Sequence, residues 1–529
     1  MNAKRAGERP DILLIVVDDM GWSDLGAFGG EIDTPHLDAL AARGVKLTNF
    51  HASPLCSTTR AMLMTGCDHH QVGLGTMAEI LTPEQRGKPG YEGYLNDRAE
   101  TIAERFRRGG YSTLMSGKWH LGINGQSPPS AKGFDRSFAL FNGEHNHYGA
   151  DQTEETAGVP GKSGYELDGK PVLFPEGAYS TDYFAARMIE FLENADTDRP
   201  FFGYLAFTAP HSPLQAPDEL IAKYHGKYDE GPEVLRDRRL AKMRRLGLSV
   251  ADARPADFYG SKPWGELPPE VRALEARKME VYAAMMEAMD LAVGRVVATL
   301  KRIGRLDNTV IVFLSDNGPS GTMRETAPRW REWIAERCVN SLDNIGRANS
   351  YASIGPRWAE AQAAPFLLFK RYTTEGGVRT CAFATGLGVE GGRESNAFIH
   401  VTDLPPTLLD LAGIDAVSAP GKLTMRGVSV AGIFSGTRAE VHSPDEAVGW
   451  ELSYARALRK GDWKAVYLPT VAQSIAPELP VNRWLLFNLT ADPGETTDLA
   501  AKEPGKLQEL VVAWEAYAKE TGVVMPVSA

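Results

Sequence analysis

Five short apolar runs constrain the fold of this 529-residue chain most strongly, because each is rich in β-branched or aromatic residues and is followed at once by polar ones. Their apolar residues are mostly continuous rather than alternating, which is typical of strands buried on both faces of a parallel sheet. Helical segments lie between them. We therefore predict an α/β fold: a large, doubly wound, mostly parallel sheet flanked by helices. The predicted strands are Ile12–Val17, Tyr111–Ser116, Phe201–Thr208, Thr309–Ser315 and Phe366–Phe369.

The length of the chain and a change in its sequence pattern near the C-terminus predict a second, smaller domain. The chain is longer than most chains that fold around a single hydrophobic core. From Trp450 onward, short strand-like runs and a turn at Lys460-Gly461-Asp462 indicate an antiparallel hairpin, and an amphipathic helix is expected over Pro504–Glu520. We predict an α/β domain over residues 1–435 and an α+β domain, an antiparallel sheet plus a helix, over residues 436–529. The helices predicted in the first domain are one opened by Pro35 and ended by Gly44, and those over Asp97–Arg108, Thr181–Asn194 and Leu274–Ile303.

Charge and composition exclude several functions. The net charge of −11 argues against a broad surface for nucleic acid or anionic membranes. Four cysteines in so long a chain make no disulfide framework. No apolar run approaches transmembrane length, and the N-terminal residues lack the core of a signal peptide. We therefore expect a cytoplasmic protein with no nucleic-acid or membrane partner, whereas the oligomeric state is not predicted.

Polar residues at the ends of two predicted strands are candidate metal ligands. Asp18 and Asp19 follow the first strand, and Asp316 and Asn317 follow the fourth. The carboxyl ends of parallel strands meet at one edge of the sheet, where ligands bind. Hard oxygen ligands without a cluster of thiolates or imidazoles suit Ca²⁺ or Mg²⁺ rather than zinc. Taken singly, each pair would instead be a turn or a cap.

The stretch from Pro54 to His70 predicts a loop that turns into a helix. Residues 57–59, Ser-Thr-Thr, are N-cap residue types, and an apolar, helix-prone run follows them. Cys56 would then lie at or near the helix N-terminus, with Arg60 about one turn further on, and both features favour a thiolate. Cys56 is therefore a candidate nucleophile. The alternative is a small buried cysteine beside a structural arginine.

This stretch resembles the signature of the type I sulfatases of the alkaline phosphatase superfamily, which is Cys-x-Pro-Ser/Thr-Arg followed by an apolar run and Thr-Gly. Cys56, Thr59, Arg60 and the Thr65-Gly66 end match it, and Thr58 stands where the family has Pro. Residues 69–79 and 340–358 resemble the bacterial cytoplasmic arylsulfatases most. The resemblance covers nearly the whole chain, and its further motifs, in sulfatase order, are Asp18-Asp19-Met20-Gly21, Gly117-Lys118-Trp119-His120-Leu121-Gly122, Ala209-Pro210-His211-Ser212-Pro213, Asp316-Asn317-Gly318, Lys370 with Glu375-Gly376-Gly377, and Asp492-Pro493-Gly494-Glu495.

The resemblance implies a nucleophile, a metal and a substrate class. Cys56 would be converted to formylglycine by a formylglycine-generating enzyme, and the aldehyde hydrate would attack a small-molecule sulfate ester. The expected reaction is hydrolysis of an aryl or alkyl sulfate to an alcohol or phenol and inorganic sulfate, through a covalent sulfo-enzyme intermediate. The implied metal is Ca²⁺, with Mg²⁺ as the second choice, and its ligands would be the modified Cys56, Asp18, Asp19, Asp316 and Asn317.

The resemblance also implies the roles of the remaining site residues. Asp316 would help to take the proton of the attacking hydroxyl, and His211 and Lys370 would protonate or stabilise the departing oxygen. His120 would take the proton of the second hydroxyl, which expels sulfate and regenerates the aldehyde. The residues that would orient the hydrate and balance its charge are Arg60 and Lys118.

Two other functions stay open. The same site could serve a phosphonate monoester or phosphodiester hydrolase, because sulfuryl and phosphoryl transfer need similar geometry. If Thr58 prevents the conversion of Cys56, the chain would be a catalytically silent, metal-binding protein of sulfatase fold.

Two long segments interrupt the alternation of strands and helices, Ser212–Pro268 and Pro319–Pro365. Each is expected to form a lid or pocket wall, or else a surface elaboration that packs its own tryptophans. The tryptophans of the second segment lead to the hypothesis of a pocket that favours aromatic or alkyl leaving groups over large sulfated polysaccharides.

Overall fold

The computed structural model describes residues 9–150, 164–260, 262–328, 330–474 and 478–525. At its centre is a ten-stranded sheet in which β1 is paired in parallel with β9 on one side and β8 on the other. β4 and β5 continue the parallel set beyond β8, so the predicted large, mostly parallel sheet is confirmed. The strand order is β11 (Arg393–Ser395), β2 (Val45–Leu47), β10 (Ala382–Gly386), β9 (Thr309–Ser315), β1 (Asp11–Val17), β8 (Phe201–Ala206), β4 (Ser112–Lys118), β5 (Arg136–Leu140), β6 (Tyr165–Leu167) and β7 (Lys170–Val172).

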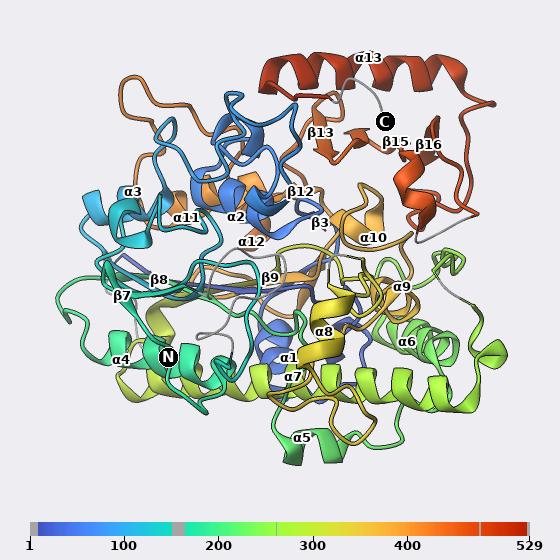
Figure 1. Cartoon of the computed structure of the whole chain (residues 1–529). Helices are drawn as coiled ribbons and strands as arrows, with labels where there is room; N and C mark the ends of the chain where they lie inside the picture. Colours follow the sequence, from blue (N-terminus) through green and yellow to red (C-terminus); the bar gives the residue numbers. More distant parts are fainter. Residues whose placement is uncertain (1–8, 151–163, 261, 329, 475–477, 526–529) are drawn as a thin grey trace.

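Helices cover both faces of this sheet (Figure 1). All seven residues of β1 are buried, and alternate side chains belong to two different hydrophobic clusters, as strand geometry requires. One cluster holds Leu13 and Ile15, and the other holds Leu14 and Val16. The helices packed in the first cluster are α1 (Pro35–Ala42), α4 (Ser180–Glu193) and α7 (Pro269–Arg302), and those in the second are α2 (Cys56–Thr65), α3 (Ile102–Arg108) and α11 (Leu404–Leu411).

One of the five predicted strands is wrong. Phe366–Phe369 forms turns rather than a strand, and Leu368 within it has a positive φ of 58°. Leu367 and Phe369 pack in a cluster with the C-terminal sheet, so packing rather than strand pairing explains the apolar run. The neighbour of β9 is instead β10, which is antiparallel and has the weakly apolar sequence Ala-Phe-Ala-Thr-Gly.

The predicted helices are present, with shifted ends. α3 is shorter than predicted because Thr101 caps it: its hydroxyl accepts the N–H of Glu104, whose carboxylate accepts the N–H of Thr101. α7 begins earlier than predicted, with Pro269 in its first turn. α2 begins at Cys56, and its N-cap is Leu55 in an extended conformation, so residues 57–59 lie in the first turn rather than at the cap.

The predicted C-terminal antiparallel sheet and helix are confirmed. The strands pair in the order β13-β14-β15-β16, and the predicted hairpin turns at Gly461, which has a φ of 56°. One face of this sheet packs on the segment that contains Phe369 and Tyr372, and the other packs under α13 (Figure 1). The boundary between residues 435 and 436 stays a prediction. The bounds are β13 (Ala447–Leu452), β14 (Ala455–Lys460), β15 (Trp463–Tyr467), β16 (Trp484–Asn488) and α13 (Pro504–Thr521).

The two interrupting segments carry short helices of their own. Residues 212–268 contain α5 (Asp218–Lys223) and α6 (Pro232–Leu246), and residues 319–365 contain α8 (Arg331–Arg337) and α9 (Pro356–Ala363). Among the residues that the structure describes, no helix is both long enough and apolar enough to span a bilayer.

Candidate active site

Side chains from four strands of the parallel set meet beyond their carboxyl ends, as predicted. Asp18 and Asp19 follow β1, Asp316 and Asn317 follow β9, Lys118 ends β4, and His211 follows β8. Asp19 and His120 have positive φ angles of 67° and 54°, which side-chain-bearing residues rarely adopt. The chain turns sharply after β1 and β4 at these two residues.

Cys56 is the first residue of α2 and is buried. Its predicted place at a helix N-terminus is confirmed, and its Sγ lies 3.1 Å from Nζ of Lys370. The prediction of a stabilised thiolate is wrong. Burial, together with the negative charge of Asp18, raises the pKa of the Cys56 thiol far above its ordinary value, despite the cations of Lys118 and Lys370.

Two lysines neutralise the aspartates after β1. Lys118 Nζ donates to Asp18 Oδ2 at 2.5 Å, and Lys370 Nζ donates to Asp19 Oδ1 at 2.6 Å. Burial alone would raise the pKa of Asp18, but the positive charge of Lys118 and of other nearby cations outweighs it and holds that pKa well below its usual range. Asp18 is thus a carboxylate inside a buried, charge-balanced cluster.

Arg60 is fully buried and links β9 to β4. It donates to Asp316 Oδ2 from Nη2 at 2.8 Å and from Nε at 3.1 Å, and Nη1 donates to the Lys118 carbonyl and to the Tyr204 hydroxyl. Burial and the charge of Asp18 raise the pKa of Asp316 to about 7, although Arg60 opposes the shift.

Several acceptor atoms in this cluster fit a hard cation. One ligand atom each from Asp18, Asp19, Cys56 and His211 all lie within 4.8 Å of one another. Asp18 Oδ1, Asp19 Oδ2 and Asn317 Oδ1 are buried and have no hydrogen-bond partner in the structure. Unpaired buried oxygens of this kind are costly unless a cation or water meets them. Asp316 is not part of the group of four, and the predicted ligand set therefore stays a prediction.

Each histidine of the site has one ring nitrogen engaged. His120 Nε2 lies 3.1 Å from Glu79 Oε1, so the proton belongs on Nε2, and Nδ1 is a buried acceptor without a partner. His211 Nδ1 lies 2.6 Å from the Ser212 carbonyl, which assigns its proton, and Nε2 faces Asp19 Oδ2 at 3.5 Å. Burial lowers the pKa of both histidines.

A pocket of about 730 Å³, open solvent included, gives access to this cluster. Trp330 and Arg324 from the segment 319–365 line it, so this segment forms part of the pocket wall, as the first of its two interpretations expects. Trp358 of the same segment is instead 1% exposed and packs in the main core against Trp264 of the segment 212–268. The predicted site residues that line the pocket are Cys56, His120, His211 and Lys370.

Sequence reasoning missed the role of three neighbours of these residues. Glu79 fixes the ring of His120, Tyr204 hydrogen-bonds Arg60, and Glu144 accepts from Arg324 at the pocket wall. Tyr204 lies within a predicted strand, so its burial was foreseeable, but nothing in the sequence couples it to Arg60. Glu79 and Glu144 lie in loops, where no periodicity predicts which way a side chain points.

The fold and the site together define the class of protein. It is an α/β protein in which cationic side chains and carboxylates surround one cysteine at the strand ends, and such a site is suited to bind an anionic ester. A model of the family described as Sulfatase matches residues 10–414. An uncharacterized sulfatase of Schizosaccharomyces pombe is 43% identical over 541 residues, covering 99% of this chain and 96% of that protein. The arylsulfatase of Klebsiella aerogenes is 38% identical over 435 residues, covering 80% of this chain and 92% of that protein.

Solved structures have the same fold. The crystal structure of Ps i-CgsB, in complex with k-i-k-neocarrahexaose, has a TM-score of 0.67 and 24% identity, covering 97% of this chain and 93% of that one. A structure solved in complex with its substrate D-glucosamine-2-N,6-O-disulfate has a TM-score of 0.61 and 20% identity, covering 97% of this chain and 98% of that one. The chain belongs to the sulfatase family, as its sequence motifs predict, and the likeness to bacterial arylsulfatases is confirmed.

Proposed function

We propose that this protein hydrolyses aryl or alkyl sulfate esters to a phenol or alcohol and inorganic sulfate at the cluster around residue 56. The class, a sulfuric ester hydrolase, follows from the family and from relatives that are named arylsulfatases. The observation that carries the finer proposal is the position of Cys56. It is buried at the start of α2, 3.1 Å from the Lys370 ammonium and in one group with Asp18, Asp19 and His211.

We propose formylglycine as the working form of residue 56. The raised pKa of the Cys56 thiol makes the unmodified side chain a poor nucleophile at neutral pH. As a formylglycine hydrate, residue 56 supplies one hydroxyl for attack on sulfur and a second one for the later elimination of sulfate. The hydroxyl of Thr58, where the family has Pro, is hydrogen-bonded to Ser53 and to the Leu55 carbonyl, so this departure is accommodated in the first turn of α2.

The chain's own residues can move the protons that this reaction needs. Asp316, whose pKa is raised by burial and by the charge of Asp18, is suited to take the proton of the attacking hydroxyl. Lys370 and His211 lie on the pocket side of the cluster. The Lys370 ammonium can stabilise or protonate the departing oxygen, and His211 can do so once its Nε2 carries a proton. His120 Nδ1, an unpaired buried acceptor, is suited to take the proton of the second hydroxyl. Arg60 and Lys118 stay charged and orient the carboxylates that surround residue 56.

We propose Ca²⁺ as the metal, with Mg²⁺ as the second choice, held by Asp18, Asp19, Asp316, Asn317 and residue 56. The three unpaired oxygens of Asp18, Asp19 and Asn317 support a hard cation. When bound, such an ion polarises a sulfate oxygen and favours the ionised form of a nearby hydroxyl. Its test is thermal: Ca²⁺ should raise the melting temperature of the wild type by mass action, and Asp19→Asn should abolish the rise. An equal rise in both proteins contradicts this site.

The activity itself is tested by comparing two esters with the same leaving group. We expect kcat/KM for 4-nitrophenyl sulfate to exceed that for a 4-nitrophenyl phosphonate monoester, and Cys56→Ala to abolish sulfate hydrolysis while leaving the fold intact by circular dichroism. A preference for the phosphonate assigns the site to the alternative hydrolase. No turnover of either ester assigns the chain to the catalytically silent alternative.

A further inference from the structure

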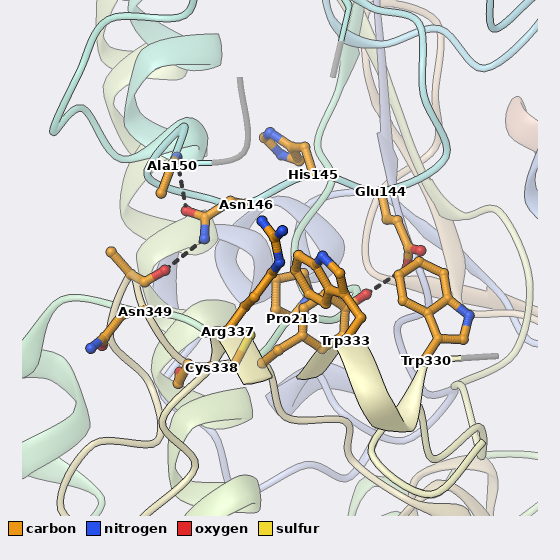
Figure 2. Close-up of a pocket in the computed structure, with 13 residues that line it drawn as sticks. Glu144, His145, Asn146, Ala150, Pro213, Trp330, Trp333, Arg337, Cys338 and Asn349 are labelled. Atoms are coloured by element: carbon orange, nitrogen blue, oxygen red, sulfur yellow. Dashed lines mark hydrogen bonds between the residues drawn. The ribbon is translucent and has the colours of Figure 1, made fainter. Parts of the chain in front are cut away.

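A second pocket shares two lining residues, Glu144 and Trp330, with the pocket around Cys56. Its cavity volume is about 280 Å³, near the lower limit of about 300 Å³ for small-molecule pockets. Figure 2 shows Trp330 and Trp333 of the segment 319–365 standing along it, with Pro213 behind them. Its other described lining residues include Arg337, Cys338, Asn349 and Tyr351.

Aromatic rings form a fixed wall of this pocket. The Tyr351 ring lies 5.9 Å from that of Trp330 and 6.2 Å from that of Trp333, the latter pair nearly perpendicular at 88°. The Arg324 guanidinium lies 4.8 Å from the Trp330 ring centre, and Glu144 Oε2 accepts from both Arg324 and the Tyr351 hydroxyl. These contacts hold Trp330 in place between the two pockets, so a ligand finds a preformed apolar surface there.

Polar groups that line this pocket already make hydrogen bonds within the protein. Asn146 donates to the Ala348 carbonyl and accepts two backbone N–H groups, and the Ser350 hydroxyl donates to the Arg347 carbonyl. His145 is engaged at both ring nitrogens. The buried Nε1 of Trp333 is a donor without a partner in the structure. Arg337 and Asn349 line the pocket as well, so its walls are not wholly apolar. The rings of Trp330, Trp333 and Tyr351 nevertheless form much of these walls and favour an apolar ligand over a sugar, whose ring carries a hydroxyl on nearly every carbon.

We propose that this pocket binds the apolar arm of the substrate's leaving group, so that the enzyme selects sulfate esters of extended aryl or alkyl alcohols. The inference rests on the proposed function, because it places the sulfate in the pocket around Cys56 and the arm past Trp330. Burying each methylene of such an arm is worth about fourfold in binding at 0.8 kcal/mol per CH₂. The arm therefore contributes to specificity, while the chemistry stays at residue 56.

A homologous series tests the arm without changing the reacting bond. In 4-alkylphenyl sulfates from methyl to hexyl, the reactivity of the leaving group is nearly constant and only the length of the alkyl chain changes. We expect kcat/KM to rise by up to about fourfold for each added methylene until the pocket is filled. A flat series across these lengths overturns the proposal.

Two substitutions, one that enlarges the pocket and one that fills it, test whether the dependence on chain length arises in this pocket. Trp333 and Ala348 line this pocket but not the pocket around Cys56. Trp333→Ala removes part of the wall, and Ala348→Phe fills the space. Each should lower the hexyl-to-methyl ratio of kcat/KM by about tenfold or more, with the methyl ester little changed. Glu332→Ala, an exposed residue on the same helix, α8, is the matched control and should leave the ratio unchanged. A wild-type ratio in both pocket variants overturns the proposal.

Binding of sulfonates keeps the test independent of turnover. In 4-alkylbenzenesulfonates carbon replaces the ester oxygen, so they bind without being hydrolysed. We expect the Kd of the hexyl compound, measured by calorimetry, to be lower than that of the methyl compound, and Trp333→Ala to remove most of the difference. Tail-dependent binding without any sulfate turnover supports the pocket and contradicts the proposed function. Turnover with equal Kd values and a flat series contradicts the pocket alone.

Discussion

At the scale of single residues, one carboxylate decides which nitrogen of His120 is free. Glu79 accepts from Nε2 at 3.1 Å, and its charge raises the pKa of His120, against the larger opposite effect of burial. In the proposed reaction His120 must be neutral to accept a proton at Nδ1, so protonation of His120 sets an acid limb in the pH profile of kcat.

Glu79→Gln tests this arrangement, because glutamine keeps an acceptor for Nε2 and removes the charge. The pKa of His120 should fall, and the acid limb of kcat should move to lower pH than in the wild type. The measurement is a pH profile of kcat on an aryl sulfate, with Glu84→Gln, an exposed residue of the same region, as the control. An unmoved limb in Glu79→Gln contradicts the role of this pair.

Residue identities at the strand ends were predictable, whereas their protonation was not. Asp18, Asp316 and His211 follow apolar runs, and parallel strands bring such ends together. The helix N-terminus predicts a lowered pKa for Cys56, but full burial and the neighbouring Asp18 reverse that sign. Sequence reasoning does not account for how deeply the folded protein buries a group, and this burial raises the pKa of Cys56.

At the scale of elements, the loop after α2 is joined to the C-terminal sheet and helix by a buried ionic group. His70 Nδ1 lies 2.8 Å from Asp68 Oδ1, its Nε2 lies 3.1 Å from Glu451 Oε2 of β13, and the Tyr517 hydroxyl of α13 donates to Asp68 Oδ2. Burial would lower the pKa of His70, but hydrogen bonds and charge from Asp68, with those of Glu451, outweigh it and raise the pKa to about 9. A charged imidazole therefore links three elements.

The raised pKa makes this link depend on pH. Because the pKa of His70 is higher in the folded protein than in the unfolded chain, its stabilisation is fully present below about pH 6.5 and is lost as the pH rises through 9. His70→Gln should therefore lower the free energy of unfolding by about 3 kcal/mol more at pH 6 than at pH 10, measured by urea titration. His225→Gln, 84% exposed, should show no such difference. An equal loss at both pH values contradicts a charged His70.

Element types were predictable where periodicity or caps were strong. The strands at β1 and β9 and the helices at α4, α7 and α13 match the predicted patterns. Phe366–Phe369 fails because four apolar residues are compatible with any buried conformation. The antiparallel β10 was missed because its alanines, threonine and glycine carry a weak strand signal, and its place is set by pairing with β9.

At the scale of the whole molecule, a second buried network connects the C-terminal sheet to the loop that carries Lys370. Lys464 of β15 donates to Glu375 at 2.7 Å and lies 3.0 Å from Glu495, and all three side chains are fully buried. Glu375 begins the short helix α10 (Glu375–Val378), five residues after Lys370. Through this network, the C-terminal sheet helps to hold in place the loop that carries Lys370.

Lys464→Met should weaken both stability and activity, because it leaves the buried Glu495 without its cation and Glu375 with only Arg379 and His51 beside it. The expected loss is about 3–5 kcal/mol in the free energy of unfolding, with a lower kcat/KM for an aryl sulfate. Lys460→Met, at the partly exposed end of the neighbouring strand β14, should leave kcat/KM unchanged and cost far less stability. Loss of stability with wild-type kcat/KM would show that the network does not reach Lys370. Sequence analysis predicted the second domain but not this coupling, since Lys464 and Glu375 lie 89 positions apart in the sequence.

The state of residue 56 decides the central claim of sulfate ester hydrolysis through formylglycine. The most direct measurement is the mass of the peptide that carries Cys56, from protein purified from its native host. The account predicts formylglycine at this position, with aryl sulfate turnover proportional to the converted fraction. Cysteine left unmodified throughout the preparation would contradict it.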